Sequence, residues 1–196
     1  MKKIYFLAGL PRSGSTVLAA LLQQHPELHA TSTSGLLDLL MGTLGAWSDS
    51  LGEQSSARED KSKDAEIQKI LQSICLTKYE GIDKKIILDK HRGWPAPMNL
   101  RTMEKVLRHP PKIVATVRNV EDCVASMVRV VKPHDLTEFC RHSDLVDHIK
   151  SSYQCLQTGY SAYPECIHFV EYDDLVDNPV ETLRKVEQFL ELYPHE

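Results

Sequence analysis

Lys3-Ile-Tyr-Phe-Leu-Ala-Gly9-Leu-Pro-Arg12-Ser-Gly14-Ser-Thr16 is the stretch that decides the fold of this chain. Residues 4–8 form a run of β-branched, aromatic and aliphatic side chains, which predicts a buried strand. Glycine and proline then break the run, and apolar residues return at helical spacing over 17–22. A strand, a glycine-bearing loop and a helix in this order form a cradle for phosphate, because the loop N–H groups and the first helical turn direct their positive ends to one spot.

The loop departs from the Walker A pattern at one position. Gly9, Gly14 and Thr16 match G-x-x-x-x-G-K-[ST], but Ser15 stands where the pattern has lysine. The Walker lysine contacts the β- and γ-phosphates of a triphosphate, so its absence argues against hydrolysis of ATP or GTP. Arg12 keeps a cation inside the loop. The alternative, a plain turn rich in glycine and serine, is disfavoured by the flanking strand and helix.

The composition predicts one globular domain over residues 1–196. Hydrophobic residues make up 42% of the chain and charged residues 26%, which is ordinary for a globular protein. The formal net charge of −4 argues against general binding of nucleic acid, while a local basic anion site stays compatible with it. No run approaches the roughly 18 apolar residues that a membrane span needs.

Cysteine and histidine usage favours a cytoplasmic protein without a metal site. The five cysteines are odd in number and lack C-x-x-C spacing, which indicates reduced thiols rather than a disulfide framework or a zinc site. The nine histidines show no metal-ligand spacing either. The first residues resemble a secretory signal superficially, but Pro11 and Arg12 interrupt the apolar run and no small-residue cleavage site follows.

Helices and strands alternate along the rest of the chain. Apolar periodicity predicts helices over 36–47, 64–79, 98–108, 120–131, 136–148, 149–160 and 179–192, and strands over 85–89, 112–117 and 166–172. Residues 48–63 are rich in serine and charge, so they are interpreted as a mobile surface insertion, either a lid or a loose loop. The pattern predicts an α/β fold in three layers, similar to that of P-loop nucleoside-triphosphate hydrolases, with a central parallel sheet of about four to five strands.

Polar residues follow each predicted strand. They occupy residues 12–16, residues 89–92, Arg118 and residues 172–174. Ligands of parallel α/β sheets gather at the carboxyl ends of the strands. We therefore expect these four segments to converge on one edge of the sheet.

A second candidate anion site lies in Val117-Arg118-Asn-Val-Glu121-Asp122-Cys-Val-Ala-Ser126. Arg118 ends a predicted strand, and Ser126 lies two turns into the helix that follows. A guanidinium and a hydroxyl in this arrangement can donate hydrogen bonds to one anion. The alternative is that Arg118 only forms a salt bridge with Glu121 or Asp122.

Together, the two stretches resemble the signature pair of the sulfotransferase family. Members use PAPS (3′-phosphoadenosine-5′-phosphosulfate) as sulfuryl donor and release PAP. Pro-Arg-Ser-Gly-Ser-Thr resembles the family's 5′-phosphosulfate loop, and Val-Arg-Asn-x-x-Asp-x-x-x-Ser resembles its 3′-phosphate site. The segment from Val170 to Leu190 is similar to the family's third stretch, Tyr-Glu-Asp-Leu followed by proline and Phe-Leu. The Pro-Arg-Ser-Gly form of the loop is closer to the carbohydrate and tyrosylprotein branches than to the steroid and phenol enzymes.

The resemblance implies a set of residues that bind the donor. The 5′-phosphosulfate would lie on the loop, and the 3′-phosphate would lie on the second stretch, with a tyrosine near the nucleotide. Carried onto this sequence, the loop residues are Arg12, Ser13, Gly14, Ser15 and Thr16, and the others are Arg118, Ser126 and Tyr172. PAPS carries no triphosphate, so no metal is required.

The general base is less clearly marked. Tyrosylprotein enzymes carry a glutamate shortly after a stretch similar to His25-Pro26-Glu27, but this chain has Thr31-Ser-Thr-Ser there. The best replacement is Asp89-Lys90-His91-Arg92, in the region where cytosolic members place a Lys-x-His pair. His91 would accept the proton, because imidazole exchanges a proton near neutral pH. Arg12 and Lys90, or Arg92 in place of Lys90, would steady the leaving oxygen, and Asp89 would orient or replace the histidine.

These observations predict a PAPS-dependent sulfotransferase that acts on a hydroxyl or amine of a small-molecule or carbohydrate acceptor. Two alternatives stay open. One is a P-loop kinase of small molecules, which would leave Arg118 and Ser126 without a role. The other is a degenerate homologue that binds the nucleotide without catalysis. A homo-oligomer is also compatible with the sequence.

Overall fold

The computed structural model describes residues 2–52 and 61–193. Five parallel strands form its sheet in the order β2-β3-β1-β4-β5. The strands are β1 (Lys3–Gly9), β2 (Leu28–Ala30), β3 (Ile86–Lys90), β4 (Ile113–Val117) and β5 (Ile167–Glu171). The predicted α/β class, with a parallel sheet of four to five strands, is confirmed.

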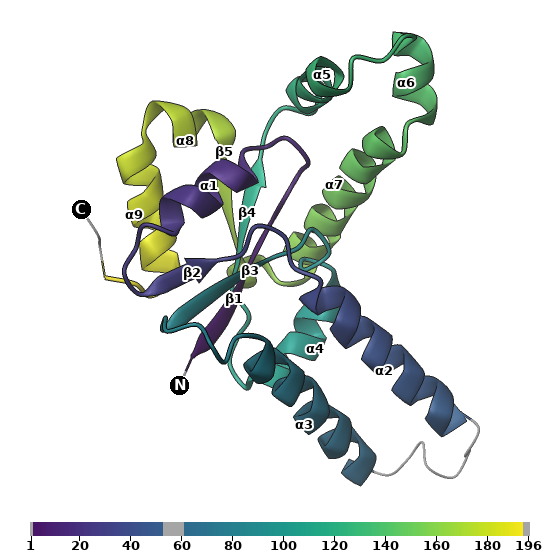
Figure 1. Cartoon of the computed structure of the whole chain (residues 1–196), viewed down its shortest axis with the longest axis vertical. Helices are drawn as coiled ribbons and strands as arrows, with labels where there is room; N and C mark the ends of the chain where they lie inside the picture. The colour runs from purple at the N-terminus through teal and green to yellow at the C-terminus, as the bar shows by residue number, and fades with distance from the viewer. Residues whose placement is uncertain (1, 53–60, 194–196) are drawn as a thin grey trace.

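Helices cover both faces of this sheet (Figure 1). The helices are α1 (Ser15–Leu22), α2 (Leu36–Gly52), α3 (Lys61–Lys78), α4 (Pro97–Leu107), α5 (Val120–Val131), α6 (Leu136–His142), α7 (Asp144–Ala162), α8 (Tyr172–Asp177) and α9 (Pro179–Phe189), with a short 3-10 turn η2 at Pro164–Cys166. Residues 53–60 of the predicted mobile insertion lie outside the described residues. None of the described helices is long and apolar enough to cross a membrane.

The strand β1 contributes to both hydrophobic cores. Ile4, Phe6 and Ala8 pack with side chains of α2, α3, α4 and α7, whereas Tyr5 and Leu7 pack with side chains of α1 and α9 on the other face. Successive side chains of a strand point to opposite faces of the sheet, and burial of both faces explains the continuous apolar run. The carboxyl end of β1 is therefore held rigidly at the centre of the sheet, where the glycine-bearing loop begins.

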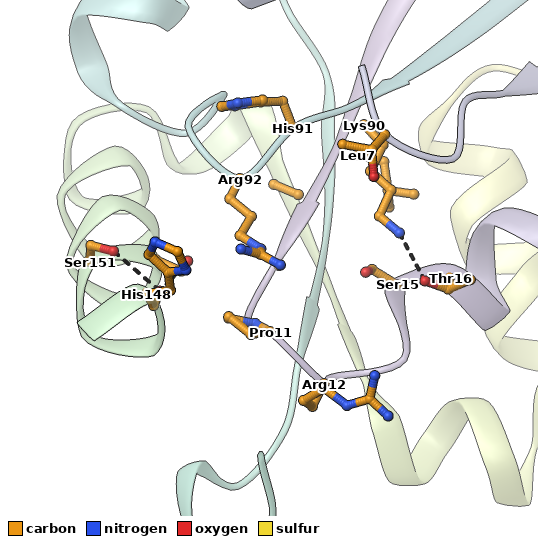
Figure 2. Close-up of a pocket in the computed structure, with 14 residues that line it drawn as sticks. Leu7, Pro11, Arg12, Ser15, Thr16, Lys90, His91, Arg92, His148 and Ser151 are labelled. Atoms are coloured by element: carbon orange, nitrogen blue, oxygen red, sulfur yellow. Dashed lines mark hydrogen bonds between the residues drawn. The ribbon is translucent and has the colours of Figure 1, made fainter. Parts of the chain in front are cut away.

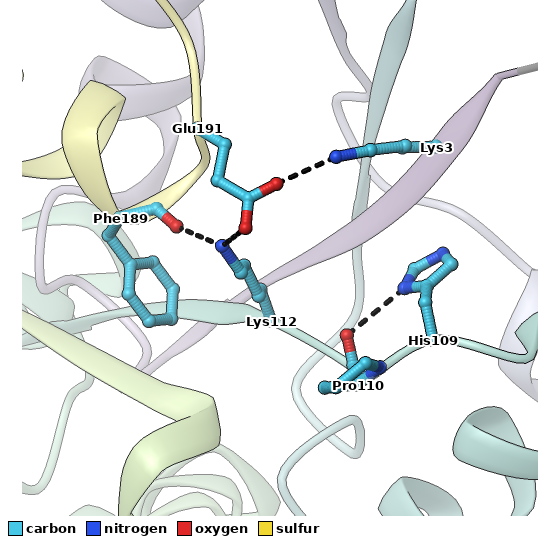
Figure 3. A network of polar contacts seen from close by, with 6 residues as sticks. All are labelled: Lys3, His109, Pro110, Lys112, Phe189 and Glu191. Carbon is cyan, nitrogen blue, oxygen red and sulfur yellow. Dashed lines mark hydrogen bonds and ion pairs between the residues drawn. The ribbon is translucent and has the colours of Figure 1, made fainter.

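A polar network joins the amino-terminal ends of β1 and β4 to the end of α9 (Figure 3). The carboxylate of Glu191 accepts hydrogen bonds from Lys3 at 2.7 Å and from Lys112 at 2.8 Å. The ammonium of Lys112 also donates to the carbonyl oxygen of Phe189 at 2.7 Å. The two lysines begin or precede β1 and β4, so one carboxylate joins both strands to the end of the last helix.

The structure differs from the sequence-based expectation in several places. Within the predicted mobile insertion over 48–63, residues 48–52 continue α2 and residues 61–63 begin α3. Residues 28–30 form the edge strand β2, and residues 172–177 form the short helix α8, neither of which was predicted. The break between the two helices after 136 lies at Ser143, not at 148–149. Ser143 caps α7, because its hydroxyl accepts a hydrogen bond from the N–H of Leu145 at 3.2 Å.

Candidate functional site

The loop between β1 and α1 is closely packed on β4. Gly9 has φ 143°, and a β-carbon at this position would lie 2.2 Å from the hydroxyl oxygen of Thr116. The N–H of Leu10 donates to the carbonyl oxygen of Thr116 at 3.1 Å. Only glycine combines this backbone conformation with such close contact to a neighbouring strand. The loop is thus fixed relative to β4 before any ligand binds.

The buried side chain of Ser13 connects the loop to β4. Its side chain is fully buried, and its hydroxyl lies 2.6 Å from the carbonyl oxygen of Leu10, 3.0 Å from that of Thr116 and 2.7 Å from the hydroxyl of Thr116. The hydroxyl of Ser13, one of the loop residues expected to hold the phosphosulfate, is therefore turned into the protein. This geometry makes Ser13 a positioning residue for the loop.

A cavity of about 440 Å³ opens at the carboxyl ends of β1 and β3. Figure 2 shows the loop residues Ser15 and Thr16 on one side of it and His148 of α7 on the other, with Arg92 between them. Arg12, Lys90 and Arg92 all line the cavity, and no described carboxylate does. A pocket with this excess of positive charge favours an anionic ligand. The segments 12–16 and 89–92 thus meet at one edge of the sheet, as the strand pattern predicts.

Lys90 supplies an ammonium group to the loop. In the register of the sheet it pairs with Leu7, and its Nζ donates to the hydroxyl of Thr16 at 3.0 Å. Burial and the nearby guanidinium of Arg92 lower the pKa of Lys90. The lysine that the Walker pattern places at position 15 is thus replaced by a lysine from β3 that reaches the start of α1.

Asp89 lies in the interior rather than in the cavity. It is fully buried, and its two carboxylate oxygens accept hydrogen bonds from the hydroxyl of Tyr79 and, at 2.8 Å, from the indole N–H of Trp94. Burial and this carboxylate raise the pKa of Tyr79, which keeps the phenol protonated as a donor. Asp89 therefore has a structural role, which fixes the chain after β3, in place of the predicted catalytic one.

His91 lines the cavity, but its ring nitrogens are engaged. The N–H of Gly93 donates to Nδ1 at 3.0 Å, so the neutral ring carries its proton on Nε2. Nε2 lies 3.6 Å from a carboxylate oxygen of Asp38. The one lone pair of the neutral imidazole is already in use. This geometry does not fit the predicted role of general base.

The second anion stretch lies beside the loop. The guanidinium of Arg118 stacks 4.0 Å from the ring centre of Tyr172, so these two predicted residues lie together. The Nε of Arg118 is buried and makes no hydrogen bond to any residue in 2–52 or 61–193, and it lies 3.8 Å from a carboxylate oxygen of Asp122. Ser126 is bonded instead to Arg12, whose Nε donates to its hydroxyl at 3.2 Å. The salt bridge to Asp122 is the alternative that the sequence left open for Arg118. Binding of one anion by Arg118 and Ser126 together stays a prediction.

Sequence reasoning missed the contribution of α7. His148, Ser151 and Ser152 line the cavity opposite the loop, but they belong to no motif and only the packing of α7 brings them there. In the described part of the chain, no three His, Cys, Asp or Glu side chains are grouped so that they could hold a metal ion.

Several known proteins resemble this chain. A protein-tyrosine sulfotransferase 2 from Gallus gallus is 27% identical over 95% of this chain and 50% of its own length. A protein-tyrosine sulfotransferase 1 from Danio rerio is 25% identical over 96% of this chain and 53% of its own length. The chain thus spans about half the length of these curated relatives.

Solved structures share the fold. A sulfotransferase domain from the curacin biosynthetic pathway is 21% identical and superposes with a TM-score of 0.63 over 100% of this chain and 75% of that chain. A mouse sulfotransferase complexed with PAP is 17% identical, with a TM-score of 0.58 over 100% of this chain and 60% of that chain. Residues 5–196 match the sulfotransferase family as a whole. The predicted resemblance is confirmed, and the chain belongs to the sulfotransferase family.

Proposed function

We propose that this protein transfers a sulfuryl group from PAPS to a hydroxyl or amine of an acceptor. Membership of the sulfotransferase family supports this activity, and one neighbour in structure is described as a complex with PAP. The cavity beside the loop offers the cations and the helix start that a phosphosulfate requires.

Arg118 carries the proposal. Its buried Nε makes no hydrogen bond to the described residues and has only the carboxylate of Asp122 nearby, at 3.8 Å. A buried donor without a hydrogen bond is costly, and a bound anion would supply one. Arg118 lines a different pocket from Arg12 and Lys90, so these side chains give two cationic sites at the carboxyl ends of the strands. A nucleotide with phosphate on both its 3′ and 5′ positions fits two such sites, whereas ATP carries all of its phosphate in one chain.

In the proposed reaction, the protein positions the two substrates and neutralises the charge that develops in the transition state. PAPS, when bound, supplies a sulfuryl group activated by its bond to phosphate. The acceptor oxygen forms a bond to sulfur in line with the breaking bond to the bridging phosphate oxygen, where negative charge accumulates. Lys90 and Arg12 are the cations that neutralise this charge, and the loop N–H groups and the start of α1 assist them.

Calorimetric titration tests the donor site. We expect PAP to bind the wild-type protein more tightly than ATP with Mg²⁺, and Arg118→Ala to weaken PAP binding at least tenfold, since a charged hydrogen bond is lost. Arg129→Ala is the matched control, because this exposed arginine lies on α5 and lines neither the cavity beside the loop nor the pocket of Arg118. Tight binding of Mg-ATP that ignores Arg118 would favour the P-loop kinase. Binding of neither nucleotide would overturn the proposal.

A panel of candidate acceptors, tested with PAPS as donor, identifies the acceptor class. The relatives are named for protein tyrosine, so an acidic peptide that contains tyrosine belongs in it, beside N-acetylglucosamine and 4-nitrophenol. Release of PAP from PAPS that depends on one acceptor would assign the acceptor class. If PAP binds but no acceptor of any class is turned over, the degenerate, non-catalytic homologue becomes the better account.

A further inference from the structure

We propose that His148 of α7 is the general base that removes the proton from the acceptor. The inference rests on the proposed sulfuryl transfer and assigns the general base for it. An acceptor hydroxyl attacks sulfur poorly unless its proton is taken up as the new bond forms.

His148 lines the cavity across from the phosphate loop. Figure 2 shows its imidazole on the α7 side, facing Pro11 and Arg92, with Ser15 and Thr16 beyond them. The side chain is exposed to the cavity, and its ring nitrogens make no hydrogen bond to any residue that the structure describes. A lone pair on the ring is therefore available to an incoming O–H group.

The backbone around His148 is well fixed. Its carbonyl oxygen accepts hydrogen bonds from the hydroxyls of Ser152 at 2.6 Å and Ser151 at 3.2 Å. The next residue, Ile149, is only 2% exposed and belongs to the core. Because these contacts anchor this turn of α7, the imidazole is presented to the cavity from a rigid element, as a catalytic base requires.

The other groups of the described cavity do not provide a free base. His91 has its lone pair occupied by the N–H of Gly93, and Asp89 is buried with both oxygens bonded. Arginine stays protonated in proteins, and the ammonium of Lys90 is bonded to the hydroxyl of Thr16 on the opposite side of the cavity. No carboxylate lines the described part of the cavity. Among these side chains His148 has both an open lone pair and a suitable proton affinity.

The step balances without another reagent. As the acceptor oxygen bonds to sulfur, its proton moves to the free ring nitrogen of His148, and the bond between sulfur and the bridging oxygen breaks. Its electron pair leaves with PAP, and the imidazolium releases the proton to water. The charged groups that face His148 are Arg12, Lys90, His91 and Arg92 across the cavity and Asp144 one turn earlier on α7.

NMR titration of the imidazole resonances tests the placement of His148 without any acceptor. The resonance is assigned by its loss in His148→Gln. We expect saturating PAPS to move the titration midpoint of His148 to higher pH by at least about 0.5 pH unit, because a nearby anion favours the imidazolium. His109, whose ring faces Tyr5 away from the cavity, is the control and should not move.

The outcomes separate this inference from the proposed function. If calorimetry shows PAPS bound and the midpoint of His148 stays unchanged, His148 does not face the donor, and the inference fails while the proposed function stands. If PAPS does not bind, both fail together.

Kinetics with the acceptor identified from the panel then measure the role itself. We expect His148→Gln to lower kcat about 100-fold, to leave PAP affinity within twofold and to abolish the acidic limb of the pH–rate profile. His91→Gln, which removes the rival histidine, should keep that limb, and so should His109→Gln, whose ring lies against Tyr5. A His148→Gln enzyme that retains the acidic limb would overturn the assignment.

Discussion

The guanidinium of Arg12 donates a hydrogen bond from Nε to the hydroxyl of Ser126 over 3.2 Å, and so joins the loop after β1 to α5. The two residues are 114 positions apart in sequence. They belong to the two stretches predicted separately as sites for the two ends of the donor. Their contact places the two sites side by side, and it leaves Arg12 within reach of both.

Loss of Arg12 should therefore impair catalysis more than folding. We expect Arg12→Ala to lower kcat/KM for PAPS by about 100-fold, because a cation placed at developing charge contributes mainly in the transition state. The free energy of unfolding should change by less than about 0.5 kcal/mol, since Arg12 is exposed. Arg101→Ala, an exposed change on α4, is the control. An unchanged kcat/KM in Arg12→Ala would remove Arg12 from the site.

Ser13 should show the opposite pattern. Ser13→Ala removes a buried hydroxyl that contacts Leu10 and Thr116, and we expect it to lower the free energy of unfolding by about 1–3 kcal/mol, measured by urea denaturation. Ser15→Ala, on the cavity side of the same loop, should change stability by less than about 0.5 kcal/mol. Equal stability of the two variants would contradict the buried contact.

The elements of the fold could be predicted where their local pattern was strong. The bounds of β1, β3, β4 and β5 agree with the expected strands to within one residue. β1, β3 and β4 are largely apolar runs buried on both faces, whereas the edge strand β5 is only partly buried. Two short elements escaped prediction. The edge strand β2 has only three residues, which is too few for a periodic signal, and α8 has six residues that begin with tyrosine and two aspartates.

The site could be predicted only in part, for a similar reason. The glycines of the loop have conformations that local sequence encodes, whereas the contact of Lys90 with Thr16 depends on which strand pairs with β1. In the sequence, Asp89 is a polar residue at the end of a predicted strand. In the structure, it is bonded to Tyr79 and Trp94, which lie outside that strand. Tertiary packing produces both the contact of Lys90 with Thr16 and the burial of Asp89, and the spacing of residues within one segment does not predict such packing.

Gly14 should be required for the nucleotide site. It has φ 88°, and a β-carbon here would lie 2.8 Å from the ring of Tyr172, on which Arg118 stacks. We expect Gly14→Ala to weaken PAP binding at least tenfold in calorimetry, because the loop and the tyrosine must separate. Gly45→Ala on α2 is the matched control, because its added methyl group would have no atom of the described chain within 4 Å outside its own helix, and it should leave binding unchanged. PAP binding of wild-type strength in Gly14→Ala would contradict this packing.

Donor binding should weaken at alkaline pH through Lys90. Burial and the neighbouring Arg92 lower the pKa of Lys90, so the ammonium loses its charge at a lower pH than an ordinary lysine does. We expect PAP affinity, titrated from pH 7 to pH 10, to fall as Lys90 deprotonates. Lys90→Arg should keep affinity constant over this range, and Lys90→Met should bind weakly at every pH. A wild-type protein whose affinity follows that of Lys90→Arg would show that Lys90 does not contact the anion.

Glu191 should make the fold sensitive to acid (Figure 3). Hydrogen bonds from Lys112 and Lys3 lower its pKa to about 2. Because the folded pKa lies below the unfolded value, the contribution to stability is complete above about pH 4.5 and is lost as pH falls toward 2. The carboxylate is largely exposed, so we expect Glu191→Gln to lower the free energy of unfolding by only about 0.5 kcal/mol at pH 7. Urea denaturation at pH 7 and pH 2 measures this difference, which should be much smaller at the lower pH, where the carboxylate is about half protonated. Glu181→Gln, which removes the weaker 3.9 Å pair with Lys185 on α9, should change stability less at pH 7, and an equal loss in both variants would argue that Glu191 does not join the strands to the helix.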